Sequence, residues 1–149
     1  MYAQVLVATD GSELAMRALD HAIELAMLAG STITVVTVTD PLNVYMGGYA
    51  GIAGTTFDPV PEVLEAQLEG ARQLLKAAEA RVAAAGVAVK TVLVENAFAA
   101  EGIISTAESI GATLIVMGSH GRRALGRLLL GSQTNEVLAH SKIPVLVTR

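Results

Sequence analysis

The chain has 149 residues, of which 52% are hydrophobic and 16% are charged. That length suits one domain with a single core, so we expect residues 1–149 to form one domain. Its apolar content excludes a disordered chain. The sequence has no cysteine, which excludes disulfides, thiolate zinc sites and cysteine nucleophiles. The apolar runs are far shorter than the roughly 18 residues of a membrane span, and the N-terminus lacks a signal-peptide pattern. We therefore expect a soluble, cytoplasmic protein with no membrane partner.

The net charge of -4 is unevenly distributed along the chain. Residues 1–99 carry 5 basic and 11 acidic side chains, whereas residues 100–149 carry 5 basic and 3 acidic ones. Arg122, Arg123 and Arg127 supply most of this local basic character. An acidic chain with only 3% aromatic residues is not typical of nucleic-acid-binding proteins. The basic region indicates a small anion instead.

Short β-branched runs alternate with longer helical patterns. We expect strands at residues 4–9, 32–38, 87–94, 113–117 and 143–148, and helices at 13–29, 61–85, 99–110 and 132–140. This alternation, with strands that are near-continuous apolar runs, predicts a parallel sheet covered on both faces, a three-layer α/β/α sandwich. Residues 39–60 form a long predicted loop, which is either pinned by its own aromatic residues or serves as a lid or partner contact.

Ligands of open parallel sheets bind beyond the carboxyl ends of the strands, where the strand order reverses. We expect the first and fourth strands to flank that point. The first ends in Thr9-Asp10-Gly11-Ser12 and the fourth in residues 117–121, Met-Gly-Ser-His-Gly. Both segments are short, polar and rich in glycine, so they mark the predicted site.

A glycine pattern extends from the fourth strand to the last helix: Gly118, then Gly121 two residues later, then Gly131-Ser132 nine residues further on. Glycine lets a phosphate approach the backbone closely, and the free amides at a helix start favour an anion. Ser132 offers a hydroxyl group and is also a normal helix N-cap. The pattern therefore predicts a phosphate site.

Competing motifs fail. Residues 126–132 resemble a Walker A loop but lack its lysine, and neither a dinucleotide G-x-G-x-x-G nor a hydrolase G-x-S-x-G is present. His120 lies within the glycine pattern. It is either a phosphate contact, an acid–base group or simply an exposed residue. Among the arginines, Arg122 is the first candidate for a phosphate contact because it follows Gly121.

Asp10 has two compatible interpretations. With Glu13 it has the spacing of a capping box, which predicts that it caps the following helix. It also stands at the predicted switch point, where a carboxylate can accept a ribose hydroxyl group or hold Mg²⁺. We therefore treat Asp10 as the candidate metal ligand.

Over its whole length the chain resembles the nucleotide-binding universal stress proteins. The resemblance rests on residues 7–12, 114–121, 128–132, 137–140 and 143–147, which match the family's first turn and C-terminal signature. It implies the strand order 3-2-1-4-5, with adenine between Val38 and Met117 and ribose near Asp10 and Gly118. Phosphates would then lie along Gly121, Gly131, Ser132 and the Gln133 amide. Residues 96–98, Asn-Ala-Phe, depart from the Gly-Asp-Pro or Gly-Glu-Pro that the family often carries there.

The resemblance implies a cytoplasmic stress-response regulator that binds ATP, AMP or a cyclic nucleotide and has further protein partners. No residue pair resembles a tuned acid and base, so at most slow, Mg²⁺-assisted ATP hydrolysis at Asp10 is expected. Two alternatives remain: an interaction module with a vestigial pocket, and a nucleotide-dependent transferase that takes a substrate site from residues 39–60.

In the order 3-2-1-4-5 the last strand is an edge. Ile143, Val145, Leu146 and Val147 make it apolar, and only Pro144 interrupts it. Soluble proteins normally cover such an edge. We therefore expect a homodimer through the C-terminal strand, closed by a two-fold axis. The competing interpretation is that the 39–60 loop or a helix covers the edge.

Overall fold

The computed structural model of the chain describes residues 1–41, 61–121 and 130–149. Within these ranges its strands are β1 (Gln4–Ala8), β2 (Thr32–Val38), β3 (Val89–Val94), β4 (Leu114–Gly118) and β5 (Val145–Thr148). Its helices are α1 (Glu13–Ala29), α3 (Pro61–Ala84), α4 (Ala99–Ser109) and α5 (Ser132–His140). None of these helices is long and apolar enough to cross a lipid bilayer. The predicted loop at 39–60 falls mostly outside the described residues.

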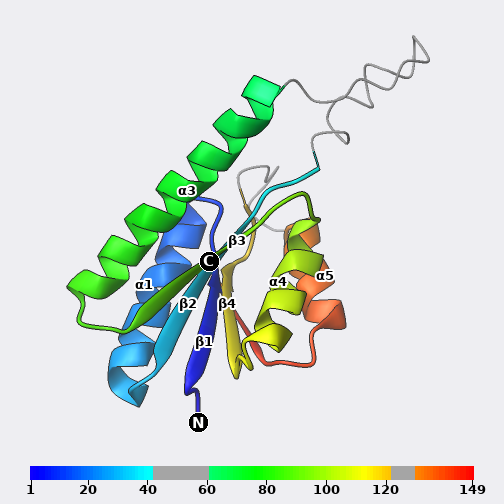
Figure 1. Ribbon diagram of the computed structural model, residues 1–149. Helices are drawn as coiled ribbons and strands as arrows, with labels where there is room; N and C mark the ends of the chain where they lie inside the picture. The colour runs from blue at the N-terminus through cyan, green and yellow to red at the C-terminus, as the bar shows by residue number, and fades with distance from the viewer. Residues whose placement is uncertain (42–60, 122–129) are drawn as a thin grey trace.

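The five strands form one parallel sheet in the order β3-β2-β1-β4-β5. Helices α1 and α3 cover one face and α4 and α5 cover the other, so the three-layer prediction is confirmed (Figure 1). Strand β1 lies at the centre and pairs with β2 on one side and β4 on the other. The strand order therefore reverses at the carboxyl ends of β1 and β4, where ligands of such sheets bind.

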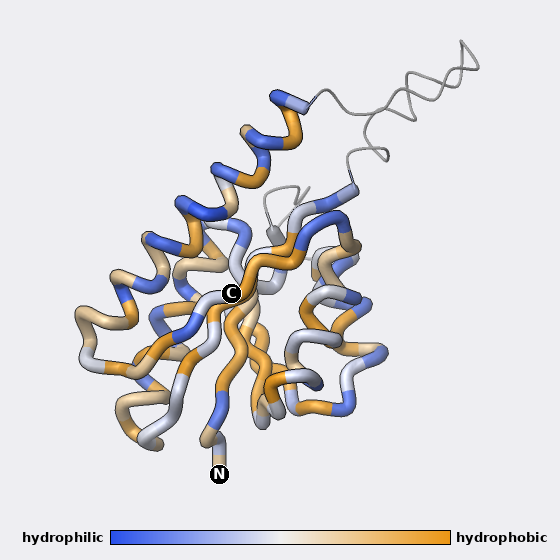
Figure 2. Tube along the Cα trace, viewed as in Figure 1, coloured by the Kyte–Doolittle hydropathy of each residue, from blue (hydrophilic) through white to orange (hydrophobic). Residues whose placement is uncertain are grey.

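The core consists of two layers, one on each side of the sheet. Val5 and Val7 face α1 and α3, whereas Leu6 between them faces α4 and α5, and all three are fully buried. The pleat directs successive side chains to opposite faces, which explains why three consecutive positions of this central strand are apolar. Figure 2 shows this apolar centre between helices with polar outer surfaces.

Helix α1 starts as its sequence predicts, but with a different cap. Its N-cap is Ser12, whose hydroxyl oxygen accepts a hydrogen bond from the Ala15 amide at 3.2 Å. The predicted Asp10–Glu13 capping box is therefore wrong. Gly11 has φ +77°, a left-handed turn that places Asp10 before the helix start. Glu13 pairs with Arg17 instead, at 2.6 Å.

Several predicted boundaries differ by one or two residues. The predicted strand 4–9 ends at Ala8, and 113–117 becomes Leu114–Gly118; the helices end at Ala84 and Ser109 rather than at residues 85 and 110. The predicted strand 87–94 begins at Val89, because the Val87 amide still bonds to the Val82 carbonyl oxygen of α3. The predicted strand 143–148 begins at Val145, because Ser141 holds Ile143 in a turn through its hydroxyl group.

Helices α1 and α3 are joined on the outside of the sheet. The Arg81 guanidinium group of α3 donates two hydrogen bonds to the Asp20 carboxylate of α1, at 2.6 and 2.8 Å. These hydrogen bonds and the Asp20 charge raise the pKa of Arg81. The pair is half-exposed, so it orients the two helices more than it stabilises them.

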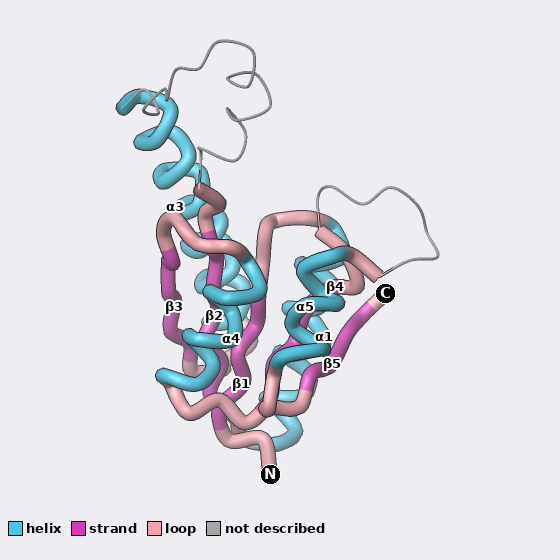
Figure 3. The backbone as a smooth tube through the Cα atoms, turned by 90° about the vertical axis from the view of Figure 1, so that its right-hand side faces the viewer, coloured by secondary structure: helices cyan, strands magenta, loops and turns pink. Residues whose placement is uncertain are grey.

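Strand β5 lies at one edge of the sheet, as Figure 3 shows. Val145 and Val147 are half-buried and pack against the α4–α5 side, whereas Leu146 between them is 40% exposed. The prediction that the C-terminal strand is an edge strand is confirmed. Whether a second subunit covers it stays a prediction.

Candidate functional site

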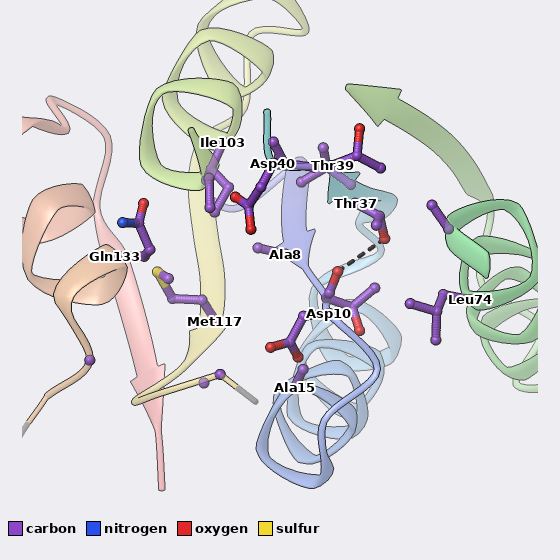
Figure 4. A pocket seen from close by; sticks show the side chains of 18 of the residues that line it. Ala8, Asp10, Ala15, Thr37, Thr39, Asp40, Leu74, Ile103, Met117 and Gln133 are labelled. Atoms are coloured by element: carbon purple, nitrogen blue, oxygen red, sulfur yellow. Dashed lines mark hydrogen bonds between the residues drawn. The ribbon is translucent and has the colours of Figure 1, made fainter. Parts of the chain in front are cut away.

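A pocket of about 750 Å³ lies at the carboxyl ends of the central strands. Residues from β1, β2 and β4, from the loops that follow them, and from α3, α4 and the start of α5 line it. Figure 4 shows Ile103, Met117 and Gln133 on one side and Leu74 of α3 on the other. The pocket therefore occupies the predicted switch point.

The fold brings together almost all of the predicted site residues. The pocket is lined by Thr9, Asp10, Val38, Met117, Gly118, Gly121, Gly131, Ser132 and Gln133. Arg122, like Arg123 and Arg127, lies outside the described residues. Segments that are far apart in the sequence thus line one pocket. The roles of the individual residues stay predictions.

One part of the pocket is apolar. Val38 at the end of β2 lines it. Met117 of β4, Ile103 of α4 and Ala8 of β1 line it as well, and Figure 4 shows these three side chains beside one another. Aliphatic and thioether groups of this kind suit a flat, weakly polar ring system.

The other part is built on the start of α5. Gly131 is the N-cap of this helix and has no capping side chain, so the expectation that Ser132 caps it is wrong; Ser132 is its first residue. The amides of the first helical residues have no partner inside the helix. Together with the helix dipole they favour an anion.

Backbone and side-chain bonds connect β4 to this helix start. The Gly131 amide donates to the Ser119 carbonyl oxygen at 2.8 Å, and the Ser119 amide donates to the Thr148 carbonyl oxygen at 2.8 Å. The Thr134 hydroxyl group donates to the Gly118 carbonyl oxygen at 3.1 Å. The two ends of the glycine pattern are therefore fixed to one another and to the sheet.

The glycines of this pattern lie in close contact with neighbouring segments. A Cβ on Gly118 would lie 3.1 Å from the Leu14 carbonyl carbon, and one on Gly131 would lie 3.1 Å from the Cα of His120. A Cβ on Gly121 would overlap the Asp10 carboxylate. Glycine thus serves the protein's own packing here as well as the predicted approach of a phosphate.

Two carboxylates point into the pocket (Figure 4). Asp10 follows β1, and its Oδ1 accepts the Ser12 amide at 2.9 Å. Asp40 follows β2, and its carbonyl oxygen accepts a hydrogen bond from Gln67 of α3 at 3.2 Å. Apart from His120, these two aspartates are the only ionisable side chains among the described lining residues.

Sequence analysis missed Asp40, although a signal was present. Strands β1 and β2 are both followed by Thr-Asp, as Thr9-Asp10 and Thr39-Asp40. Neighbouring parallel strands end at the same edge of a sheet, so the repeated dipeptide could have placed both carboxylates together. The contributions of Gln67 and Leu74 had no comparable signal, because they depend on how α3 crosses the sheet.

His120 lines the pocket, and its Nδ1 lies 3.1 Å from the Ser119 hydroxyl oxygen. Ser119 is 4% exposed and is not among the lining residues. Its hydroxyl group is therefore placed to orient the imidazole rather than to reach a ligand. Within the described ranges, no group of three or more His, Asp or Glu side chains is arranged to hold a metal ion.

Comparison with known proteins identifies the family. Residues 1–149 match the universal stress protein family. The chain belongs to this family. It is 36% identical to a universal stress protein of Thermus aquaticus over 150 residues, which cover 100% of both chains. The family resemblance, the stress-response class and the expected strand order are thereby confirmed.

Solved structures of universal stress proteins share the fold. The structure of MJ0577 from Methanocaldococcus jannaschii superposes with a TM-score of 0.81 at 30% identity, covering 99% of this chain and 96% of that one. A universal stress protein solved in complex with cAMP gives a TM-score of 0.68 at 26% identity, covering 99% and 97%. The second of these is a nucleotide complex of a related protein.

Proposed function

We propose that this universal stress protein binds an adenine nucleotide in the pocket and acts as a dimeric, cytoplasmic regulator built from one domain, residues 1–149. The ligand is ATP, or AMP or a cyclic nucleotide in the same pocket. The proposal rests on one observation: a single cavity of about 750 Å³ contains both an apolar slot and a helix N-terminus without a side-chain cap. The apolar slot suits the base of a nucleotide, and the helix N-terminus suits its phosphate.

The adenine base fits the slot between Val38 and Met117, which we call the base end. Ile103 closes this end from α4. The volume lies within the range of about 300–1,000 Å³ that is typical of small-molecule sites. The cAMP complex of a relative supports the same class of ligand.

The phosphates fit beside Gly121, Gly131 and the first amides of α5, which we call the phosphate end. Because Asp10 and Asp40 make the described lining acidic, phosphates need compensation there. Mg²⁺ favours one or two carboxylates together with phosphate oxygens, and Asp10 presents its carboxylate to the pocket. Asp10 would hold the ion and Arg122 would add a further positive charge.

The pocket fits binding better than rapid catalysis. His120 is its one imidazole among the described residues, and it is oriented by Ser119. No nucleophile with a matched base lines the described part of the cavity. The chain's own residues would therefore bind and orient the nucleotide, with at most slow hydrolysis when Mg²⁺ is bound.

The dimer follows from strand β5. Its outer edge has backbone groups for pairing with a second strand, and its exposed Leu146 adds apolar area. Pairing with the same strand of a second copy covers both. Further protein partners would then contact the outer surfaces of the dimer.

Thermal melting with a panel of nucleotides, with and without Mg²⁺, tests the function. A ligand at 100 times its Kd adds about 2.7 kcal/mol to the stability. We expect ATP, AMP or cAMP to raise the Tm and non-adenine nucleotides to do so less. If no nucleotide raises the Tm, the chain is an interaction module. Turnover of about 10 per second would instead indicate a nucleotide-dependent transferase.

A further inference from the structure

Helix α4 starts beside the pocket without a cap of its own. Its N-cap is Phe98, whose side chain makes no capping hydrogen bond and is 55% exposed. An uncapped first turn leaves amides without partners and tends to fray.

A residue of α5 supplies the missing acceptor. The side-chain Oε1 of Gln133 accepts a hydrogen bond from the Ala100 amide, in the first turn of α4, at 2.9 Å. Ala100 is buried, so its amide is shielded from water. Gln133 itself is the second residue of α5 and lines the pocket (Figure 4). One side chain thus connects the starts of two helices.

The position of α4 determines the shape of the base end. Ala99 and Ile103 of this helix line the pocket. Gly102 lies so close to the end of β2 that a Cβ there would be 2.8 Å from Cγ2 of Val38. Any displacement of the first turns of α4 therefore moves one wall of the slot and releases Val38, which forms another.

We propose that Gln133 is a positioning residue for the ligand. Its side chain holds the first turn of α4 at the base end, while its own backbone amide belongs to the helix start at the phosphate end. The two ends of the pocket are thereby coupled through one residue. This inference rests on the proposed nucleotide function, because the ligand occupies both ends.

Two variants separate the hydrogen bond from the bulk of the side chain. Gln133→Leu removes the acceptor at similar volume, and Gln133→Glu keeps an acceptor oxygen. Adenosine is the probe, because it has no phosphate for the new carboxylate to repel. Titration calorimetry measures its affinity, and NMR hydrogen exchange measures protection of the Ala100 amide.

We expect Gln133→Leu to speed exchange at Ala100 and to weaken adenosine binding by about three- to ten-fold, the range of one net hydrogen bond. Gln133→Glu should restore both. Ser141→Ala is the control, because it removes two side-chain to backbone hydrogen bonds, both to Ile143, at the far end of α5. It should lower the Tm and leave adenosine affinity unchanged.

The outcomes are distinct. If Gln133→Leu speeds exchange at Ala100 but binds adenosine like the unmodified protein, Gln133 is only a structural cap and the inference is wrong. The inference is also wrong if Gln133→Glu fails to restore affinity while it restores protection. If the unmodified protein binds neither adenosine nor any nucleotide, the proposed function fails first, and that result is seen without any variant.

Discussion

The Asp10 carboxylate fills the space that a β-carbon on Gly121 would occupy. The two residues are 111 positions apart and follow different strands, β1 and β4. Their contact places the candidate Mg²⁺ ligand directly against the candidate phosphate loop. A side chain at position 121 would therefore force the Asp10 carboxylate out of its present orientation.

The first prediction concerns this contact. Gly121→Ala should weaken Mg²⁺–ATP binding by about ten-fold or more, because the new methyl group displaces the Asp10 carboxylate. The fold should survive, since the end of a side chain can move more easily than backbone. Calorimetric titration with Mg²⁺–ATP, beside thermal melting, measures both effects.

Gly70→Ala is the control for this variant. It adds the same methyl group to a lining residue on α3, where no atom lies within 4 Å. It should raise stability by roughly 0.5–1 kcal/mol, the gain of alanine over glycine in a helix interior. Equal losses of affinity in both variants would show that Asp10 is not the cause.

The second prediction separates Asp10 from the cap of α1. Asp10→Ala should reduce both nucleotide affinity and its dependence on Mg²⁺, and should cost about 1 kcal/mol through loss of the bond to the Ser12 amide. Ser12→Ala removes the true cap and should cost about 1 kcal/mol, with the Mg²⁺ dependence intact. Denaturant unfolding and Mg²⁺ titrations compare the two. If nucleotide affinity of the Asp10→Ala protein still depends normally on Mg²⁺, Asp10 is not the metal ligand.

The third prediction concerns phosphate number. Because Asp10 and Asp40 are the acidic side chains of the described lining, bare phosphates should be repelled more as their number rises. Mg²⁺ should therefore strengthen binding of ATP most, of AMP less and of adenosine not at all. Affinities measured with Mg²⁺ and with a chelator test this order. If Mg²⁺ strengthens adenosine binding as much as ATP binding, the ion does not act through the phosphates.

The fourth prediction concerns the base end. Gly102→Ala should destabilise the protein by about 1–3 kcal/mol, the usual cost of overpacking, since its Cβ would lie 2.8 Å from Val38. The same displacement should weaken adenosine binding. Thermal melting and calorimetry are the measurements. A variant with the stability loss and unchanged adenosine affinity would show that Val38 does not contact the base.

The fifth prediction concerns the dimer. Leu146→Lys should convert a dimer into a monomer, because it places a charge at the centre of the edge strand. Leu146 is the residue to change since it is 40% exposed, whereas Val145 and Val147 pack against the protein's own core. Sedimentation velocity gives the mass. An unmodified protein that is monomeric at tens of micromolar, or a dimer that survives this lysine, would refute the β5 interface.

Local patterns in the sequence are enough to predict the strands, the helices and the fold class. Alternating apolar runs and helical patterns predict a parallel α/β sandwich because strands covered on both faces are near-continuous apolar runs. The glycine pattern and Thr9-Asp10 predict a site at the switch point because strand ends meet there. These inferences depend on local spacing and on one topological rule.

Contacts between distant segments depend on how the elements pack against one another. The N-cap of α1 is Ser12 and not the predicted Asp10, because Gly11 turns the backbone between the two residues. The overlap of Gly121 with Asp10, the entry of Asp40 into the pocket and the bond from Gln133 to Ala100 depend on how helices cross the sheet. Side-chain packing between elements sets those positions, and no spacing along the chain encodes it.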